Sequence, residues 1–130
     1  MVILGIDYGK NKMGLAISEG QLASPFRIID ISSLNEAINK ILKIIEDEKV
    51  EKIVIGVPES GEAYSITKKF IFSLKLKAIN VEIVETDETL TSQAARQKMV
   101  ELNEPTSKRS REDAYSAAIL LQDYLDGLSI

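Results

Sequence analysis

The stretch MVILGIDYGKNKMGLAISEG (residues 1–20) decides the fold, because it sets one acid inside an otherwise apolar run. Asp7 stands in this run with Gly5 before it and Gly9 after it. An unpaired carboxylate is costly in the apolar interior of a protein. Three explanations remain open for Asp7: a turn residue, part of a phosphate-binding hairpin, or a metal ligand.

Two strands and a polar break make up this stretch. The branched, apolar run VILGIDY (residues 2–8) is typical of a β-strand, and GLAIS (residues 14–18) is typical of a second one. Because few residues separate them, they are predicted to pair as an antiparallel hairpin. FRIIDI (residues 26–31), entered after Pro25, is expected to form a third strand.

Helices and strands alternate in the rest of the chain. Ser33 and Glu36 form a capping-box pattern ahead of apolar residues that recur at helical spacing. The expected elements are a helix over 34–45, a strand over 52–57 stopped by Pro58, a helix over 63–77, a strand over 81–86, and helices over 91–102 and 110–125.

This order predicts an α/β fold with a mixed five-stranded sheet flanked by helices. The first three strands are antiparallel, and the two later strands join in parallel through right-handed crossovers. The strand ending at Val57 then lies beside the first strand, and the one ending at Glu85 lies outside it. The first strand is central, and its end shares a sheet edge with the loop after Glu85, where such folds usually place their sites. Residues 1–130 are expected to form one domain.

Composition limits the chemistry that this protein can perform. The 130 residues include no Cys and no His, and the net charge is −4. Catalysis must then rest on carboxylates, Lys, Tyr, hydroxyls or a hard metal ion bound by oxygens, because His-based nucleophile pairs and the usual zinc sites are excluded. The charge argues against a broadly basic nucleic-acid-coating protein but allows a local basic patch. The missing Cys fits a cytoplasmic protein.

Three acids stand out by their context. Asp7 interrupts the central strand, Glu88 directly follows the last strand beside Asp87, and Asp113 begins a helix whose inner face is Ala and Leu. On the predicted topology the three converge. Converging carboxylates repel one another, so they need raised pKa values or a cation, for which Mg²⁺ or Mn²⁺ is the simplest partner. Metal ions held in this way can activate a water and stabilise the leaving oxygen of a phosphodiester.

Each acid also has a purely structural interpretation. Asp7 suits a turn before Gly9, and Glu88 suits a solvated loop near a helix start. Ser110 and Asp113 resemble a helix-capping pair, although Asp113 also stands four residues before Ala117, on the flank of the apolar stripe.

A basic cluster precedes the last acid. Its residues are suited to holding phosphates that flank the scissile one, while an ordinary solvated loop is the alternative. Two lysines in the hairpin turn extend the predicted nucleic-acid-binding patch. The whole set is Lys10, Lys12, Lys108, Arg109 and Arg111.

Four motifs together resemble one family. GIDYGKNKMGLAIS, IVIGVP, DETLTSQAA and DAYSAAILLQDYL follow in the same order as in the YqgF/RuvX family, within the RNase H-like, RuvC-like superfamily. The resemblance implies an RNase H-like fold, catalytic acids matching Asp7, Glu88 and Asp113, and a divalent metal cofactor. It also implies one of two activities, resolution of Holliday junctions or maturation of the 5′ end of pre-16S rRNA in ribosome biogenesis. The RNA task is preferred on the family alone.

Two departures from the family pattern concern the substrate. Many members carry a longer P-L-N-M-D-G loop after the middle strand, where this chain has only PESGEAYS. The usual Lys-rich segment before the last acid is represented by SKRSRE. Neither change affects the three acids.

Two other classes of protein compete with the nuclease prediction. An actin-like or sugar-kinase ATPase has a similar first hairpin but needs two lobes, which one short domain does not supply. A non-catalytic RNA-binding assembly factor would keep the fold, yet all three acids are retained. The oligomeric state, monomer or homodimer, stays open, although a junction resolvase calls for a two-fold dimer.

Overall fold

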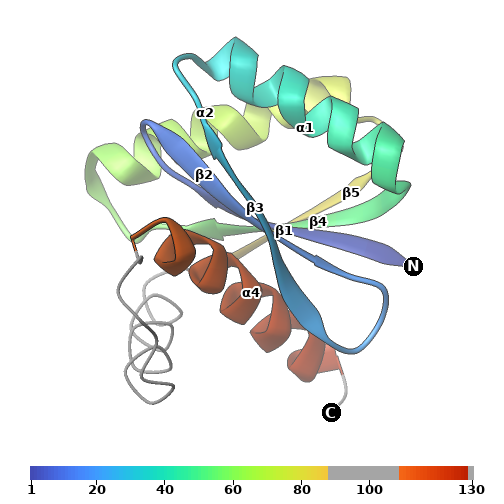
Figure 1. Ribbon diagram of the computed structural model, residues 1–130. Coiled ribbons are helices and arrows are strands. Elements are labelled where there is room, and N and C mark those ends of the chain that lie inside the picture. Colours follow the sequence, from blue (N-terminus) through green and yellow to red (C-terminus); the bar gives the residue numbers. More distant parts are fainter. Residues whose placement is uncertain (88–108, 129–130) are drawn as a thin grey trace.

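The computed structural model describes the backbone of residues 1–87 and 109–128, and side chains except those of 109–114 and 128 (Figure 1). The expected helix over 91–102 lies outside these residues. The strands are β1 (Val2–Tyr8), β2 (Lys12–Ser18), β3 (Ala23–Asp30), β4 (Val50–Val57) and β5 (Glu82–Asp87), and the helices are α1 (Leu34–Glu48), α2 (Gly61–Lys77) and α4 (Arg109–Leu128).

The strands form one mixed sheet in the order β3-β2-β1-β4-β5. β1 pairs antiparallel with β2 and parallel with β4, and β5 joins β4 in parallel. The predicted fold class is therefore confirmed, including the central place of β1 and the outer place of β5. Parallel pairing follows from the crossovers through α1 and α2, which return the chain to the same end of the sheet.

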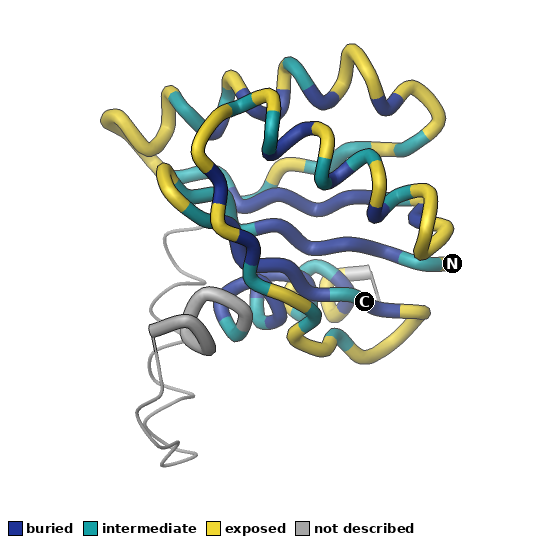
Figure 2. The backbone as a smooth tube through the Cα atoms, turned by 45° about the horizontal axis from the view of Figure 1, so that its top comes forward, coloured by how far each residue is buried: buried dark blue, intermediate teal, exposed yellow. Residues whose placement is uncertain are grey.

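Helices cover both faces of the sheet. Figure 1 shows α1 and α2 together on one face and α4 alone on the other. Side chains alternate along β1, so Leu4 and Ile6 pack in the core beneath α1 and α2, whereas Ile3 packs in the core beneath α4. The central strands are the most deeply buried part of the chain (Figure 2).

The third strand is longer than its sequence suggests. It begins at Ala23 and includes Pro25, which was expected to precede the strand. β3 is an edge strand, and its register with β2 shifts at Ala16, the partner of Pro25. A proline lacks the N–H that a central strand needs, but an edge strand with an irregular register accommodates it.

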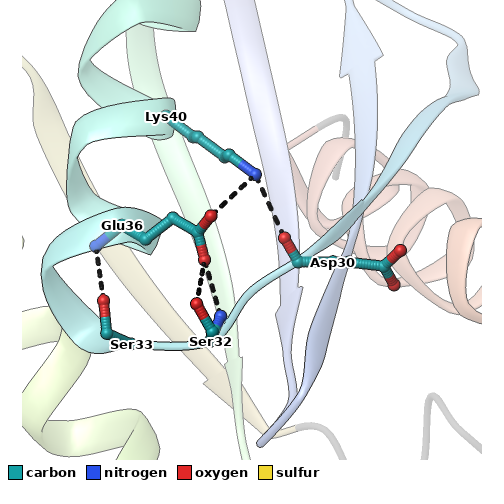
Figure 3. A network of polar contacts seen from close by, with 5 residues as sticks. All are labelled: Asp30, Ser32, Ser33, Glu36 and Lys40. Carbon is teal, nitrogen blue, oxygen red and sulfur yellow. Dashed lines mark hydrogen bonds and ion pairs between the residues drawn. The ribbon is translucent and has the colours of Figure 1, made fainter.

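The start of α1 confirms the capping prediction (Figure 3). The Ser33 hydroxyl accepts a hydrogen bond of 3.1 Å from the Glu36 N–H. The Glu36 carboxylate in turn accepts bonds from the N–H of Ser32, at 2.6 Å, and from its hydroxyl. Lys40 lies 3.3 Å from the same carboxylate and donates to the Asp30 carbonyl, which ties α1 to the end of β3.

The last helix begins slightly earlier than predicted. α4 already includes Arg109 and Ser110, so Ser110 stands inside the helix and not before it, where a capping residue stands. Within the described parts of the chain, no helix combines the length and the apolar character needed to cross a membrane.

Candidate active site

Asp7 lies next to last in the central strand, on the face covered by α4. It shares that face with Ile3 and Gly5, because side chains alternate along a strand. Its partner across the antiparallel ladder is Gly14 of β2, and the residue is half-buried. Because Gly14 has no side chain, this position of β2 places none beside the Asp7 carboxylate, at the end of the central strand.

A hollow of about 260 Å³ opens beside Asp7 in the hairpin that follows it. Its other lining residues are Gly9, Lys10, Asn11 and Lys12. The Gly9 N–H donates to the Lys12 carbonyl at 2.9 Å, which closes a tight turn. A Cβ at Gly9 would lie 2.7 Å from that carbonyl oxygen, so the turn requires glycine. The hairpin therefore forms a small hollow whose lining includes two lysines and one carboxylate, that of Asp7.

Helix α4 lies directly against the backbone of β1. A Cβ on Gly5 would stand 2.9 Å from the Leu121 Cβ and 3.1 Å from the Ala117 carbonyl oxygen. Only a glycine permits an approach this close. Gly5 thus lets α4 pack on the strand two residues before Asp7.

The helix runs opposite to β1. Tyr124, near the helix C-terminus, bonds Lys52, whose register partner is Ile3 near the start of β1. The N-terminal part of α4 therefore lies toward the Asp7 end of the strand, as Figure 1 also shows for the two elements.

This direction brings the backbone of Asp113 toward the end of β1 that carries Asp7. Asp113 precedes Ala117 by four helical residues, about 6 Å along the axis at 1.5 Å per residue. Asp7 follows Gly5 by two strand residues, about 7 Å in the same direction. Since Ala117 packs on Gly5, both acids come to the same end of the sheet.

The third predicted acid cannot be placed in the same way. β5 ends at Asp87, paired with Val57, and Glu88 lies outside the described residues, as do the side-chain atoms of Asp113. Among the side chains that the structure describes, no three acids gather into a metal-binding group. The predicted set of Asp7, Glu88 and Asp113 thus stays a prediction, with Asp7 placed in full and Asp113 by its backbone.

Another acid near this region belongs to a structural contact. Glu85 of β5 binds Lys68 and also lies 3.5 Å from Lys75, both on α2. The hydrogen bond from Lys68 lowers the pKa of the Glu85 carboxyl and raises that of the Lys68 ammonium. Glu85 holds β5 to α2 on the face opposite Asp7.

The predicted basic residues are placed unevenly. Lys10 and Lys12 both line the hollow beside Asp7. Lys108 lies outside the described residues, whereas the backbones of Arg109 and Arg111 belong to the first turns of α4. The helix direction brings those two positions toward the Asp7 end of the sheet. Their part in nucleic-acid binding stays a prediction.

Two residues beside the site, Glu62 and Tyr8, make contacts that the sequence analysis did not predict. Glu62, just before the predicted helix over 63–77, lies in the first turn of α2 and pairs with Lys10 at 3.2 Å. Tyr8 stacks on Phe70 of α2, with ring centroids 4.2 Å apart, and burial raises the pKa of its hydroxyl. Tyr8 thereby anchors the end of β1 next to Asp7. No sequence spacing could pair either residue with its contact, because both contacts join the β1–β2 hairpin to α2, which lies more than about fifty residues later in the chain.

Solved structures of low sequence identity share this architecture. T. thermophilus RuvC, in complex with a Holliday junction substrate, matches with a TM-score of 0.63 over 98% of this chain and 96% of its own, at 14% identity. The likeness shows the RNase H-like fold of the RuvC resolvases and confirms the predicted fold family.

Curated relatives match nearly the whole chain. A protein of Sulfurihydrogenibium sp. (strain YO3AOP1) is 36% identical over 98% of this chain and 91% of its own length. One of Roseiflexus sp. (strain RS-1) is 33% identical over 95% of this chain and 93% of its own. Both carry the name "Putative pre-16S rRNA nuclease".

An RNase H-like sheet with an acid near the end of its central strand, in a chain whose relatives over nearly its whole length are named as nucleases, defines the class as a nuclease, a hydrolase whose substrate is nucleic acid. The chain belongs to the RuvX family, whose model, described as Holliday junction resolvase, matches residues 1–127. The prediction of an enzyme that hydrolyses phosphodiester bonds is therefore confirmed.

Proposed function

We propose that this protein is a metal-dependent endonuclease that acts on structured RNA, with 5′-end processing of pre-16S rRNA in ribosome biogenesis as its task. The observation that supports it is the packing of α4 on Gly5, from which the helix runs on with its start, and so the Asp113 backbone, toward the Asp7 end of the sheet. Two acids far apart in the sequence thereby share one end of the sheet, beside a hollow lined with lysines.

Asp7, Glu88 and Asp113 would hold the metal. The donors that this chain offers are oxygens, since it has no Cys and no His, and oxygen donors suit Mg²⁺ or Mn²⁺. When bound, such an ion supplies a water of lowered pKa and charge stabilisation for the leaving oxygen. The half-buried position of Asp7 beside an open hollow fits this donor role.

The remaining residues would bind and orient the substrate. Lys10 and Lys12 line the hollow, where their charges attract a phosphate. Lys108, Arg109 and Arg111 would hold neighbouring phosphates from the start of α4. Gly9, which has no side chain, leaves the hairpin backbone open to the nucleic acid.

The preference for RNA rests on the relatives, whose printed names specify pre-16S rRNA. Such a precursor is made in the cytoplasm, so the protein would act there, in contact with RNA or a pre-ribosomal particle. A single domain, as monomer or homodimer, would suffice for cutting one strand.

A second candidate function is the resolution of Holliday junctions, favoured by the description of the family model. Cutting two paired strands symmetrically requires two active sites related by a two-fold axis. A resolvase would therefore be a homodimer, so a protein that is a monomer in solution would exclude this second task.

The test compares cleavage of a precursor RNA that spans the 5′ end of 16S rRNA with cleavage of a four-way DNA junction. Each substrate is incubated with Mg²⁺, with Mn²⁺ and with EDTA. We expect metal-dependent cleavage of the RNA at a defined position, absent with EDTA. Cleavage of the junction alone would favour the resolvase, and cleavage unaffected by EDTA would contradict metal dependence.

Asp7→Asn is the essential variant, because it keeps the shape of the side chain and removes its charge. Asp30→Asn serves as the matched control, since Asp30 is an exposed acid at the end of edge strand β3. We expect the Asp7 variant to lose cleavage and the Asp30 variant to keep it.

A further inference from the structure

Small residues form much of the surface on which α4 lies. Gly5 and Ala16 of the sheet meet Ala117 and Ala118 of the helix in one buried cluster. Helices normally fix their position by fitting ridges of side chains into grooves. The rest of the cluster is apolar as well, with larger side chains such as Val54 and Leu121, and apolar packing is non-directional, so it lacks the directed bonds that define one position of α4 along β1.

Directed hydrogen bonds near the other end of the helix supply the missing constraint. The Gln122 Oε1 accepts from the Ala23 N–H at 2.8 Å, and its Nε2 donates to the Gln21 carbonyl at 3.0 Å. Nε2 also donates to the Asp126 carboxylate, at 3.0 Å, one turn along the helix. The Gln122 side chain thus bonds main-chain atoms of the β2–β3 turn through both the oxygen and the nitrogen of its amide.

The turn that Gln122 grips is itself held in place. Ser18, buried at the end of β2, accepts a bond of 3.1 Å from the Gly20 N–H. Ser18 also pairs with Ile3 of β1 and with Ala23 of β3. The hydrogen bonds of Gln122 therefore connect α4, through this turn and Ser18, to β1, the strand that carries Asp7.

A second polar contact restrains the same end of the helix. The Lys52 ammonium donates to the Tyr124 hydroxyl at 2.9 Å and lies 3.7 Å from the Glu82 carboxylate. The Lys52 side chain is only 14% exposed, so the contact is largely shielded from water. It joins side chains to one another, however, whereas Gln122 contacts main-chain atoms of the β2–β3 turn.

We propose that Gln122 is a positioning residue that fixes where α4 lies along β1 and so sets the separation of Asp7 and Asp113. Nine residues of α4, about 13 Å along the helix axis, separate Gln122 from Asp113. Because the helix moves as one unit, fixing it at Gln122 also fixes the position of Asp113 along β1. The inference rests on the proposed metal-dependent function, and it assigns to Gln122 no contact with metal or substrate.

The test is the affinity for Mn²⁺, measured by titration calorimetry on the whole chain. Gln122→Met keeps the length of the side chain and removes both amide atoms. We expect its Kd for Mn²⁺ to rise ~10-fold, as is typical when a residue that orients metal ligands is lost. If Gln122→Met does not fold, Gln122→Glu replaces it, because Glu keeps the acceptor for Ala23 and loses the donor to Gln21.

Ile41→Val is the matched control, since Ile41 is a buried residue of α1, which covers the opposite face of the sheet. Its melting temperature should fall as in a mild core truncation, without a change in Kd. An unchanged Kd in the Gln122 variant, or an equal rise in the control, would overturn the positioning role. If the wild-type protein itself binds no Mn²⁺, the proposed metal chemistry fails first, and the positioning role fails with it.

Discussion

The carbonyl oxygen of Ala117 lies 3.1 Å from the point where a Cβ on Gly5 would stand. This contact joins the last helix to the central strand two residues before Asp7. Together with the direction of the helix, it brings the start of α4, with Asp113, toward the same end of the sheet as Asp7. The glycine is therefore as much a part of the candidate site as the acids.

Gly5→Ala should displace α4 as well as destabilise the protein. The added methyl would lie 2.9 Å from the Leu121 Cβ and closer than normal contact to a backbone oxygen, which cannot move aside alone. We expect a loss of about 1–3 kcal/mol in urea unfolding, the usual cost of overpacking a core. Cleavage should fall further than the unfolded fraction explains.

Gly20→Ala is the control for this substitution. No atom lies within 4 Å of a Cβ at Gly20, so the change should alter stability by less than about 0.5 kcal/mol and leave cleavage intact. Equal effects at the two glycines would show that the packing of α4 on Gly5 has no special role.

Lys10→Ala should weaken substrate binding without much loss of stability. Lys10 and Glu62 are 71% and 70% exposed, and an exposed ion pair contributes at most about 1 kcal/mol. Because Lys10 lines the hollow, we expect a higher KM at constant kcat. The dependence of log KM on log salt should also become shallower by roughly 0.7–0.9, the value of one phosphate contact.

Glu62→Gln should act in the opposite direction, because it releases Lys10 from its counter-ion and so lowers KM at low salt. Lys43→Ala is the control, since Lys43 is an exposed lysine of α1 paired with Asp47, on the other face of the sheet from Asp7. A KM that does not change in the Lys10 variant would exclude this lysine from the nucleic-acid interface.

The capping network of α1 predicts a pH dependence of stability. Bonds from the Ser32 N–H and hydroxyl, with a contribution from Lys40, lower the pKa of the Glu36 carboxyl below its ordinary 4.5. A carboxyl whose pKa is lowered by folding stabilises the folded state at pH values above its ordinary pKa. That contribution is lost as the pH falls through the pKa of the carboxyl in the folded protein. Glu36→Gln should therefore be less stable than wild type at pH 7, and the gap should narrow as the pH falls below 4.5. A gap that stays constant as the pH falls below 4.5, in urea unfolding, would contradict the network.

Much of the fold could be predicted because local patterns and topology agree. The apolar run around Asp7, the hairpin and the alternation of later elements require a sheet with β1 at its centre, and Asp7 then falls near its end. Pro25 shows the limit of such patterns. Its place inside β3 depends on β3 being an edge strand, which only the assembled sheet reveals.

The site was predictable only in part, for a related reason. Asp7 is conspicuous because an acid is unusual in an apolar strand. The roles of Gln122 and Glu62, by contrast, depend on contacts with distant parts of the chain, namely the β2–β3 turn for Gln122 and the β1–β2 hairpin for Glu62. Gln122 is one of many polar residues on α4, and nothing in its spacing indicates that its amide binds a turn about a hundred residues earlier in the chain.

A crystal of the protein soaked in Mn²⁺ tests the central claim most directly, through the anomalous scattering of the metal. The account predicts an anomalous peak within coordination distance of the carboxylates of Asp7 and Asp113, with Glu88 completing the set. The same soak of Asp7→Asn crystals should show no peak there. A metal bound elsewhere, or an empty site in a protein that still cleaves RNA with Mn²⁺, would contradict the account.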